Sequence, residues 1–329
     1  FIYFVALFAV PKTPRWLIQR RNLIQAAEKI LLRIGGAGYA KDTIREIRQG
    51  MDKKEAAGTF ADLFKSRMKT IMIIAFGIAF FQQITGINAI FYYAPTIFEQ
   101  AGGSTDSSFL QAIVVGLTNL VFTLVAIRLI DRLGRKPLLI IGTAAMTVAL
   151  GMATMAFNNA SYDISESNLG KIENASMKEH LSELAGNSYS SQKEMFAAAA
   201  DVLEEDELFS FERNEVKNFI DINATLVLVA ILLYVAAFAI SLGPVMWTLL
   251  SEIFPGNIKG IAISVVGFFN SLVSYSVTQL FPWELTNLGP TWTFALYAIL
   301  AGLSLLFVMK FVIETKGKSL DEVEELLIN

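Results

Sequence analysis

The sequence contains no cysteine and only one histidine, and charged residues make up 17% of its 329 positions. Without cysteine it forms neither a disulfide framework nor a thiolate-ligated metal site. The lone His180 argues against a histidine metal centre or catalytic triad. The sequence offers no plausible pair of nucleophile and base in one cleft. We therefore predict that the protein is not an enzyme and uses no cofactor or metal. Hydrophobic residues make up 54% of the chain, including 25 Phe, which is typical of a membrane protein.

Six apolar segments are long enough to cross a hydrocarbon core of about 30 Å as helices. We place them at 69–98, 109–130, 137–157, 223–250, 260–282 and 291–313. Residues 1–10 are apolar but too short to cross. Because the sequence does not begin with Met, we interpret 1–10 as the end of a preceding transmembrane helix whose start is missing. Pro244, with Gly243 before it, is expected to kink or break the fourth segment.

The charges on either side of these segments have opposite signs. Residues 11–69 contain 14 Lys and Arg, whereas 158–223 contain 5 Lys and Arg against 14 Asp and Glu. The positive-inside rule therefore places the basic segments in the cytoplasm and the acidic one outside. The resulting division has four parts and one long loop: an end of a helix at 1–10, a cytoplasmic helical linker at 11–68, a six-helix transmembrane bundle at 69–313 with an extracytoplasmic acidic loop at 158–222, and a cytoplasmic tail at 314–329.

Two polar regions outside the apolar segments show helical patterns. In the linker, apolar residues recur at helical spacing until Gly35 and Gly36, and a second short helix is expected around 43–47. We expect this linker to brace the bundle; the alternative is a solvated linker. In the acidic loop, 193–203 and 204–219 are candidates for short helices. We assign no chemistry to this loop, and His180 fits a surface residue better than a proton switch.

The first apolar segment carries amide side chains that are costly to bury in hydrocarbon unless they are hydrogen-bonded. Gln82, Gln83 and Asn88 lie within a run that has no charged residue from 71 to 98. On one continuous helix, at about 100° per residue, Gln82, Gly86 and Tyr93 fall within about 40° of one another. Such a stripe combines an amide, a gap and an aromatic ring. A neutral polyhydroxylated ligand would be recognised by this combination.

Six short motifs follow one another along the chain. They are Pro11–Leu17, Gln82–Asn88 followed by Phe91–Tyr93, Asp131–Pro137, Gly243–Trp247, Ser251–Pro255 with Lys259, and Glu314–Gly317. Together and in this order, they resemble signatures of the sugar porter family of the major facilitator superfamily, and among its members the bacterial proton-coupled xylose and hexose symporters. Two of them depart slightly from the family pattern, with Lys259 where Arg is usual and Ile313 where Pro is usual.

This resemblance implies an all-α membrane protein, with the C-terminal six-helix bundle of the major facilitator fold and its cytoplasmic helical linker. The implied protein lies in the cell (inner) membrane, crosses it several times and works with a missing N-terminal six-helix half. It would move a small neutral sugar, a pentose or hexose, by alternating access and proton symport, without any nucleic-acid partner. Facilitated diffusion stays open because the family's coupling acid lies in its first span. Two further alternatives are a non-transporting sugar sensor and a polyol or cyclitol transporter.

The resemblance also implies roles for individual residues. Trp247 would be the aromatic platform under the sugar, the alternative being an interfacial anchor. Asn119 would contact the sugar, the alternative being a hydrogen bond between helices. Ser271 follows Asn270 where family members often have Trp, which alters the expected pocket size. The expected substrate-binding residues are Gln82, Gln83, Asn88, Tyr93, Asn119, Gly243, Trp247 and Asn270.

Charged residues at the predicted cytoplasmic ends of the spans form a second candidate group. In the family such a network holds the two halves together in the outward-facing state and is released on inward opening. The alternative is that these charges serve only to orient the spans. The expected members are Arg15, Asp131, Arg132, Arg135, Lys136, Glu252, Lys259 and Glu314.

Overall fold

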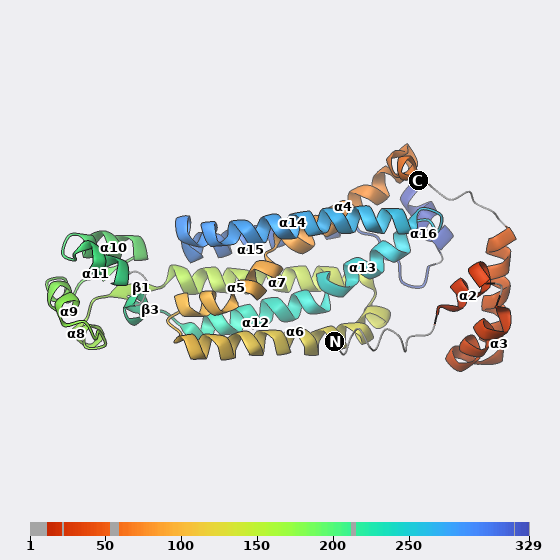
Figure 1. Cartoon of the computed structure of the whole chain (residues 1–329). Coiled ribbons are helices and arrows are strands. Elements are labelled where there is room, and N and C mark those ends of the chain that lie inside the picture. Colours follow the sequence, from red (N-terminus) through yellow and green to blue (C-terminus); the bar gives the residue numbers. More distant parts are fainter. Residues whose placement is uncertain (1–11, 22, 53–58, 212–214, 319, 329) are drawn as a thin grey trace. The chain divides into compact units, whose positions relative to one another are not determined.

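The computed structural model describes residues 12–21, 23–52, 59–211, 215–318 and 320–328. The predicted end of a helix at 1–10 lies outside these described residues. The chain forms two compact units, Phe1–Gly58 and Thr59–Asn329. Figure 1 shows both units, coloured along the sequence.

The first unit contains helices α2 (Pro14–Arg21) and α3 (Ile24–Asp52), which pack on each other. Their contact buries Leu17, Ile18 and Ala27. Helix α3 is kinked at Gly36, whose φ of 76° is a conformation that glycine adopts without steric cost. The predicted helix end at Gly35 and Gly36 is therefore a kink between two helical segments. The bracing role of this unit stays a prediction.

Among its described residues, the second unit contains six helical segments that are long and apolar enough to cross a membrane. This confirms the six spans expected from the sequence; five of them are longer than predicted by a few residues, and the last is shifted by two residues toward the N-terminus. The helices are α4 (Lys69–Ile84), α5 (Ile87–Gln100), α6 (Thr105–Leu133), α7 (Arg135–Asn158), α12 (Ala224–Ile240), α13 (Leu242–Ile253), α14 (Lys259–Asn287) and α15 (Gly289–Phe311).

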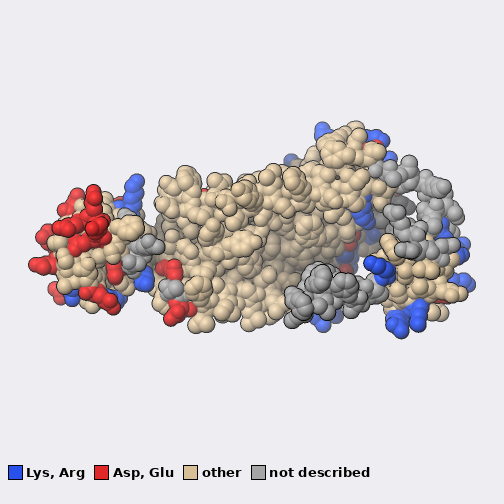
Figure 2. All heavy atoms as spheres, viewed as in Figure 1, with Lys and Arg blue, Asp and Glu red and all other residues tan. Residues whose placement is uncertain are grey.

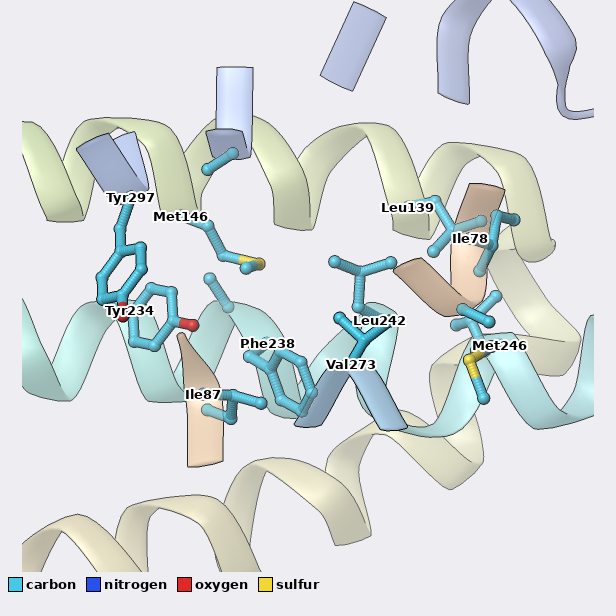
Figure 3. Close-up of a cluster of buried hydrophobic side chains, with 14 of the residues drawn as sticks. Ile78, Ile87, Leu139, Met146, Tyr234, Phe238, Leu242, Met246, Val273 and Tyr297 are labelled. Atoms are coloured by element: carbon cyan, nitrogen blue, oxygen red, sulfur yellow. The ribbon is translucent and has the colours of Figure 1, made fainter. Parts of the chain in front are cut away.

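Helix α7 is central to the packing of this bundle. It lies against α12 on one side and α15 on the other, while α4 packs on α14 and α5 packs on α6. Small residues allow these close approaches, as in many transmembrane helix pairs. At Gly142 of α7, an added Cβ would collide with the side chain of Ser241. Figure 3 shows part of the resulting core, where Met146 of α7 faces Tyr234 and Phe238 of α12.

Two of the six spans are interrupted. Helix α4 ends at Ile84, and Gly86 has a φ of +90°, so α5 begins as a separate helix. The stripe of Gln82, Gly86 and Tyr93 assumed one continuous helix, and that assumption was wrong. The second break is at Ser241, between α12 and α13. Pro244 lies in the first turn of α13, where its missing N–H costs no hydrogen bond, so the predicted break at this proline is confirmed.

Residues 161–221 form a small separate core, which we call the acidic domain. It contains a three-stranded antiparallel sheet in the order β2-β1-β3, so the first and last strands of the domain pair with each other. The sheet was not predicted and adds β-structure to an otherwise helical chain. The elements are β1 (Ser161–Asp163), α8 (Glu166–Leu169), α9 (Ala175–Ser182), β2 (Ser188–Tyr189), α10 (Gln192–Ala200), α11 (Glu205–Ser210), η4 (Val216–Asn218) and β3 (Ile220–Asp221).

Three short elements complete the second unit. Two 3-10 helices, η1 (Phe60–Phe64) and η2 (Ser66–Met68), lead into α4, and helix α16 (Leu320–Ile328) follows the last span. Each contributes apolar side chains to the core of the bundle: Leu63, Met68, Val323 and Leu327.

Candidate functional site

Four amide side chains from three helices meet inside the bundle, beside the two helix breaks. We call Gln82 and Gln83 of α4, Asn88 of α5 and Asn270 of α14 the amide cluster. Asn270 Nδ2 donates to Gln82 Oε1 at 2.8 Å, and Gln83 Nε2 donates to Asn270 Oδ1 at 3.1 Å. Asn88 Nδ2 donates to Gln83 Oε1 at 2.8 Å. The structure thus brings four of the eight predicted sugar contacts together.

Gln82 connects the cluster to the second helix break. Its Nε2 donates to the carbonyl oxygen of Leu242 at 2.9 Å and to that of Gly243 at 3.3 Å. These carbonyls lie in the first turn of α13, directly after the break at Ser241. Only 3% of Gln82 is exposed, and both its amide nitrogen and its oxygen are engaged within the protein. Gly243 therefore takes part through its backbone, and Gln82 fixes α4 to α13.

The remaining hydrogen-bonding capacity of the cluster is mostly that of acceptors. Both N–H groups of Gln83 and of Asn88 donate within the protein, whereas in the described structure Asn88 Oδ1 accepts no hydrogen bond. Ser274 Oγ accepts from Asn88 Nδ2 at 2.7 Å, which leaves its own O–H free to donate. At the amide cluster itself, a ligand would therefore meet amide oxygens and the hydroxyl of Ser274.

A cavity of about 360 Å³ opens beside the amide cluster. Gln83, Asn88 and Asn270 line it, together with Tyr92 of α5. A monosaccharide has a volume well within this space, and no charged side chain of the described residues lines it.

The sequence predicted only Asn270 of the residues that form one wall of the cavity. This wall consists of polar side chains at helical spacing along α14, which therefore share one face of that helix. The repeating positions i, i+3, i+4, i+7 and i+8 in the apolar run 260–282 were a signal that could have revealed it. The residues are Ser271, Ser274, Tyr275, Thr278 and Gln279.

Three predicted contacts lie apart from this cavity as the structure describes it. Trp247 of α13 is 46% exposed, and its ring lies against Gly267 of α14. Tyr93 packs on Phe281 with ring centroids 5.3 Å apart, because the helix break changes the face on which it lies. Asn119 lies midway along α6, partly exposed. Sugar contact by these three residues stays a prediction.

The charged residues at the other end of the bundle form a cluster centred on Arg135. Its guanidinium makes two hydrogen bonds to the Glu252 carboxylate, at 2.7 and 3.1 Å, and a third to the carbonyl oxygen of Ile130 at 3.0 Å. Asp131 Oδ1 lies 3.4 Å from the same guanidinium. Because Arg135 is nearly buried, this two-pronged pair is stronger than an ordinary surface salt bridge.

Glu314 joins the tail to this cluster. Its carboxylate accepts from the backbone N–H groups of Arg135 and Lys136, both at 3.1 Å, at the N-terminus of α7. A negative group is favourable there because it meets unpaired N–H groups and the positive end of the helix dipole. An added Cβ on Gly134 would lie 2.5 Å from Glu314 Oε2, so only glycine fits this approach.

The other predicted members differ in how they take part. Lys136 Nζ donates to the carbonyl oxygen of Met309 at 3.1 Å, and Arg132 contributes its carbonyl oxygen to Lys316 Nζ at 2.6 Å. Lys259 begins α14. The side chain of Arg15 lies outside the described residues. Thr315, which was not predicted, donates to Glu252 Oε2 at 2.6 Å.

The chain is similar to known membrane transporters along almost its whole length. The family described as "Sugar (and other) transporter" matches residues 1–171 and 209–327. The D-xylose-proton symporter of Escherichia coli K12 is 34% identical over 99% of this chain, and the arabinose-proton symporter of Bacillus subtilis is 31% identical over 99%. The glucose facilitated diffusion protein of Zymomonas mobilis is 33% identical over 98%.

Solved structures agree with these relatives. A major facilitator superfamily proton:xylose symporter bound to 6-bromo-6-deoxy-D-glucose superposes with a TM-score of 0.67 at 32% identity, over 99% of this chain and 56% of that one. The xylose transporter of E. coli in an inward-open conformation gives 0.57 at 30% identity, over 99% of this chain and 54% of that one. The chain covers 54–57% of the three relatives above, so it spans about half their length.

The six spans and the superposition define a multi-pass integral membrane protein with the major facilitator fold. The chain belongs to the sugar (and other) transporter family. Its relatives are transporters rather than enzymes. The family match leaves out 172–208, which is most of the acidic domain.

Proposed function

We propose that the whole protein transports a neutral monosaccharide, a pentose or a hexose, across the cell (inner) membrane by alternating access, and that transport is coupled to proton symport. The amide cluster beside the cavity is the observation that carries this proposal. The names of the relatives, which include two proton symporters of pentoses, support the substrate class and the coupling.

The chemistry of the cavity fits a neutral, hydroxyl-rich ligand. Sugar hydroxyls can donate to the free oxygen of Asn88 and accept from Ser274, and the ring of Tyr92 can pack against the sugar's C–H face. A charged ligand would have no opposite charge among the described residues that line this cavity. Of the eight predicted contacts, Gln83, Asn88 and Asn270 are the three that line the cavity; we assign Gln82 and Gly243 mainly to positioning them.

The charge cluster supports movement rather than binding alone. Arg135, Glu252 and Glu314 connect the ends of α6, α7, α13 and the tail through a few hydrogen bonds. Such a cluster can break and re-form as one unit, which a transporter needs and a static sugar sensor does not. We therefore favour transport over sensing, with 11–68 and 314–329 on the cytoplasmic side and 158–222 outside.

Uptake of radiolabelled D-xylose and D-glucose into vesicles that carry the full-length protein tests this proposal. We expect uptake of at least one sugar, accelerated by an inward proton gradient. A Gln83→Ala variant should lose most of the uptake, because it removes two donors and an acceptor from the cluster. The matched control Gln192→Ala, in the acidic domain, should transport normally.

Each of the following outcomes would contradict one part of the proposed function. Uptake that ignores the proton gradient would replace symport by facilitated diffusion. Binding without uptake of any sugar would favour the sensor, and uptake of a polyol or cyclitol in place of sugars would change the substrate class. Normal uptake by Gln83→Ala would remove the amide cluster from the site.

A further inference from the structure

The break between α4 and α5 is enclosed by two tyrosines from other helices. The ring of Tyr297, from α15, lies against Gly86, so that an added Cβ there would be 2.7 Å from the ring. Tyr234, from α12, lies beside Tyr297 in Figure 3. Both side chains are almost completely buried, at 2% and 0% exposure.

Each tyrosine hydroxyl has one specific acceptor. Tyr234 donates to the carbonyl oxygen of Thr85 at 2.8 Å, a group with no helical partner because α4 ends there. Tyr297 donates to Glu284 Oε2 of α14 at 2.8 Å. Side chains from α12, α14 and α15 therefore converge on a break of two residues.

The same group also contacts α5 beyond the break. Phe281 of α14 lies between Tyr93 of α5 and Tyr297, with ring centroids 5.3 and 6.1 Å apart. Its ring is nearly parallel to that of Tyr297, at 8°. Helix α5 is thus held by a row of three rings that ends at Tyr297, beside the break.

One polar atom at the break is unsatisfied in this arrangement. Thr85 Oγ1 is buried and has no hydrogen-bond partner among the described residues. A buried hydroxyl without a partner raises the free energy of the arrangement that contains it. This cost lies at the break itself, and a second arrangement of Thr85 and Gly86 that paired the hydroxyl would recover it.

This inference rests on the proposed function, in which α5 carries Asn88 and α4 carries Gln83, so that their relative position shapes the sugar site. We propose that Tyr234, Tyr297 and Glu284 form a latch that positions α5 at the Thr85–Gly86 hinge and must release when the site opens. They are positioning residues, since none of the three lines the described cavity.

The rate at which a single thiol on α5 is labelled from outside measures the latch. The 329 residues contain no cysteine, so Thr96→Cys, on an exposed position of α5, supplies the thiol. Any cysteine elsewhere in the full-length protein would be replaced. The probe is a membrane-impermeant maleimide, applied to vesicles with and without D-xylose.

We expect Tyr297→Phe and Tyr234→Phe each to change the labelling rate about fivefold, because each removes one buried hydrogen bond and keeps the ring. Glu284→Ala should reproduce Tyr297→Phe, whereas Glu284→Gln should restore the original rate because its amide oxygen still accepts. The double variant Tyr297→Phe with Glu284→Ala should show no further change, since both remove the same bond. Tyr39→Phe, in the first unit, is the matched control.

Labelling rates of Tyr297→Phe and Tyr234→Phe equal to that of the Tyr39→Phe control would overturn the latch. Additive effects of Tyr297→Phe and Glu284→Ala would also overturn it, because the two would then act separately. Uptake measured on the same vesicles separates this result from the proposed function: altered labelling without uptake of any sugar supports the latch and contradicts transport.

Discussion

The bundle and the acidic domain place polar side chains in opposite surroundings. In the bundle, amides lie inside an apolar protein and have only one another and nearby carbonyls as partners. In the acidic domain the interior is apolar, and the polar side chains mostly face solvent. Figure 2 shows the contrast, with Asp and Glu gathered over the acidic domain and almost no charge over the bundle.

The comparison shows which region of this chain is most sensitive to substitution. A buried amide network has one arrangement that satisfies every member, so each member is costly to change. A small apolar core under a charged surface tolerates variation outside, which agrees with the family match that leaves out 172–208. We therefore expect substitutions at buried amides to affect ligand binding, and substitutions in the acidic domain to affect only that domain.

The largest expected effect comes from Asn270→Leu. The change removes one hydrogen bond each from Gln82 Oε1, Gln83 Nε2 and the carbonyl oxygen of Ala79, and we expect a loss of about 4 kcal/mol of stability and of most sugar binding. Thermal unfolding in detergent and a sugar-binding isotherm measure both. The control Asn187→Leu changes an exposed amide of the acidic domain and should be nearly neutral. Equal effects of the two would remove the contrast.

Phe211→Ala tests the apolar side of the comparison. Phe211 is completely buried and packs between Phe196 and Phe219, so its loss should cost the acidic domain about 3–5 kcal/mol. Phe209→Ala, at a 63% exposed position two residues earlier, is the matched control. Hydrogen exchange should show lost protection within 161–221 in Phe211→Ala alone. Loss of sugar binding in the same variant would show that the two regions depend on each other.

Arg135→Lys should have a moderate effect. Lysine cannot reproduce the two parallel hydrogen bonds to Glu252, so we expect about a tenfold slower transport with little change in sugar affinity. Lys136→Arg, next to it, keeps a donor that reaches the Met309 carbonyl and should transport normally. A change in affinity but not in rate would place Arg135 in ligand binding instead.

The smallest expected effect is on pH dependence in the acidic domain. The hydrogen bond from His180 Nδ1 to Glu207, at 2.7 Å, raises the pKa of His180, and hydrogen bonds from Ser176 and His180 lower the pKa of Glu207. The His180 contribution to stability is complete below its unfolded value of about 6.5 and is lost as pH rises through the raised pKa. The Glu207 contribution is present above about 4.5 and is lost as pH falls through the lowered pKa.

Hydrogen exchange at α9 and α11 measures this pair. Protection should be greatest between about pH 4.5 and 6.5 and should fall above the raised pKa of His180. In His180→Ala the dependence above pH 6.5 should disappear. An unchanged pH profile in this variant would show that the ion pair does not connect the two helices in solution.

The same contrast explains which features the sequence could reveal. Long apolar runs and Pro244 determine spans and a break directly, because hydrocarbon and a missing N–H each allow few alternatives. The break at Gly86 was not predicted, since glycine also occurs within transmembrane helices. As a result Tyr93 was expected at the site, whereas the structure places Tyr92 at the cavity. The strands of the acidic domain have two or three residues, too few to show an alternating pattern.

The amide cluster of the candidate site was predictable from the sequence, and the rest of its lining was not. Amides in an apolar run indicated a polar contact, and the resemblance to sugar porters selected Asn270 on another helix. The polar face of α14 that continues to Gln279 was not predicted. Serine and threonine are a weak signal for a binding site, since in transmembrane helices they often bond to their own backbone, as Ser271 and Thr278 do.

Binding of D-xylose to the purified full-length protein, compared between the original protein and Asn88→Leu by titration calorimetry, tests the central claim most directly. Asn88 lines the cavity and has a free oxygen, and leucine has the same number and branching of side-chain heavy atoms without hydrogen-bonding groups. We predict at least tenfold weaker binding by Asn88→Leu, about 1.4 kcal/mol. Equal affinities would contradict the assignment of the amide cluster as the sugar site.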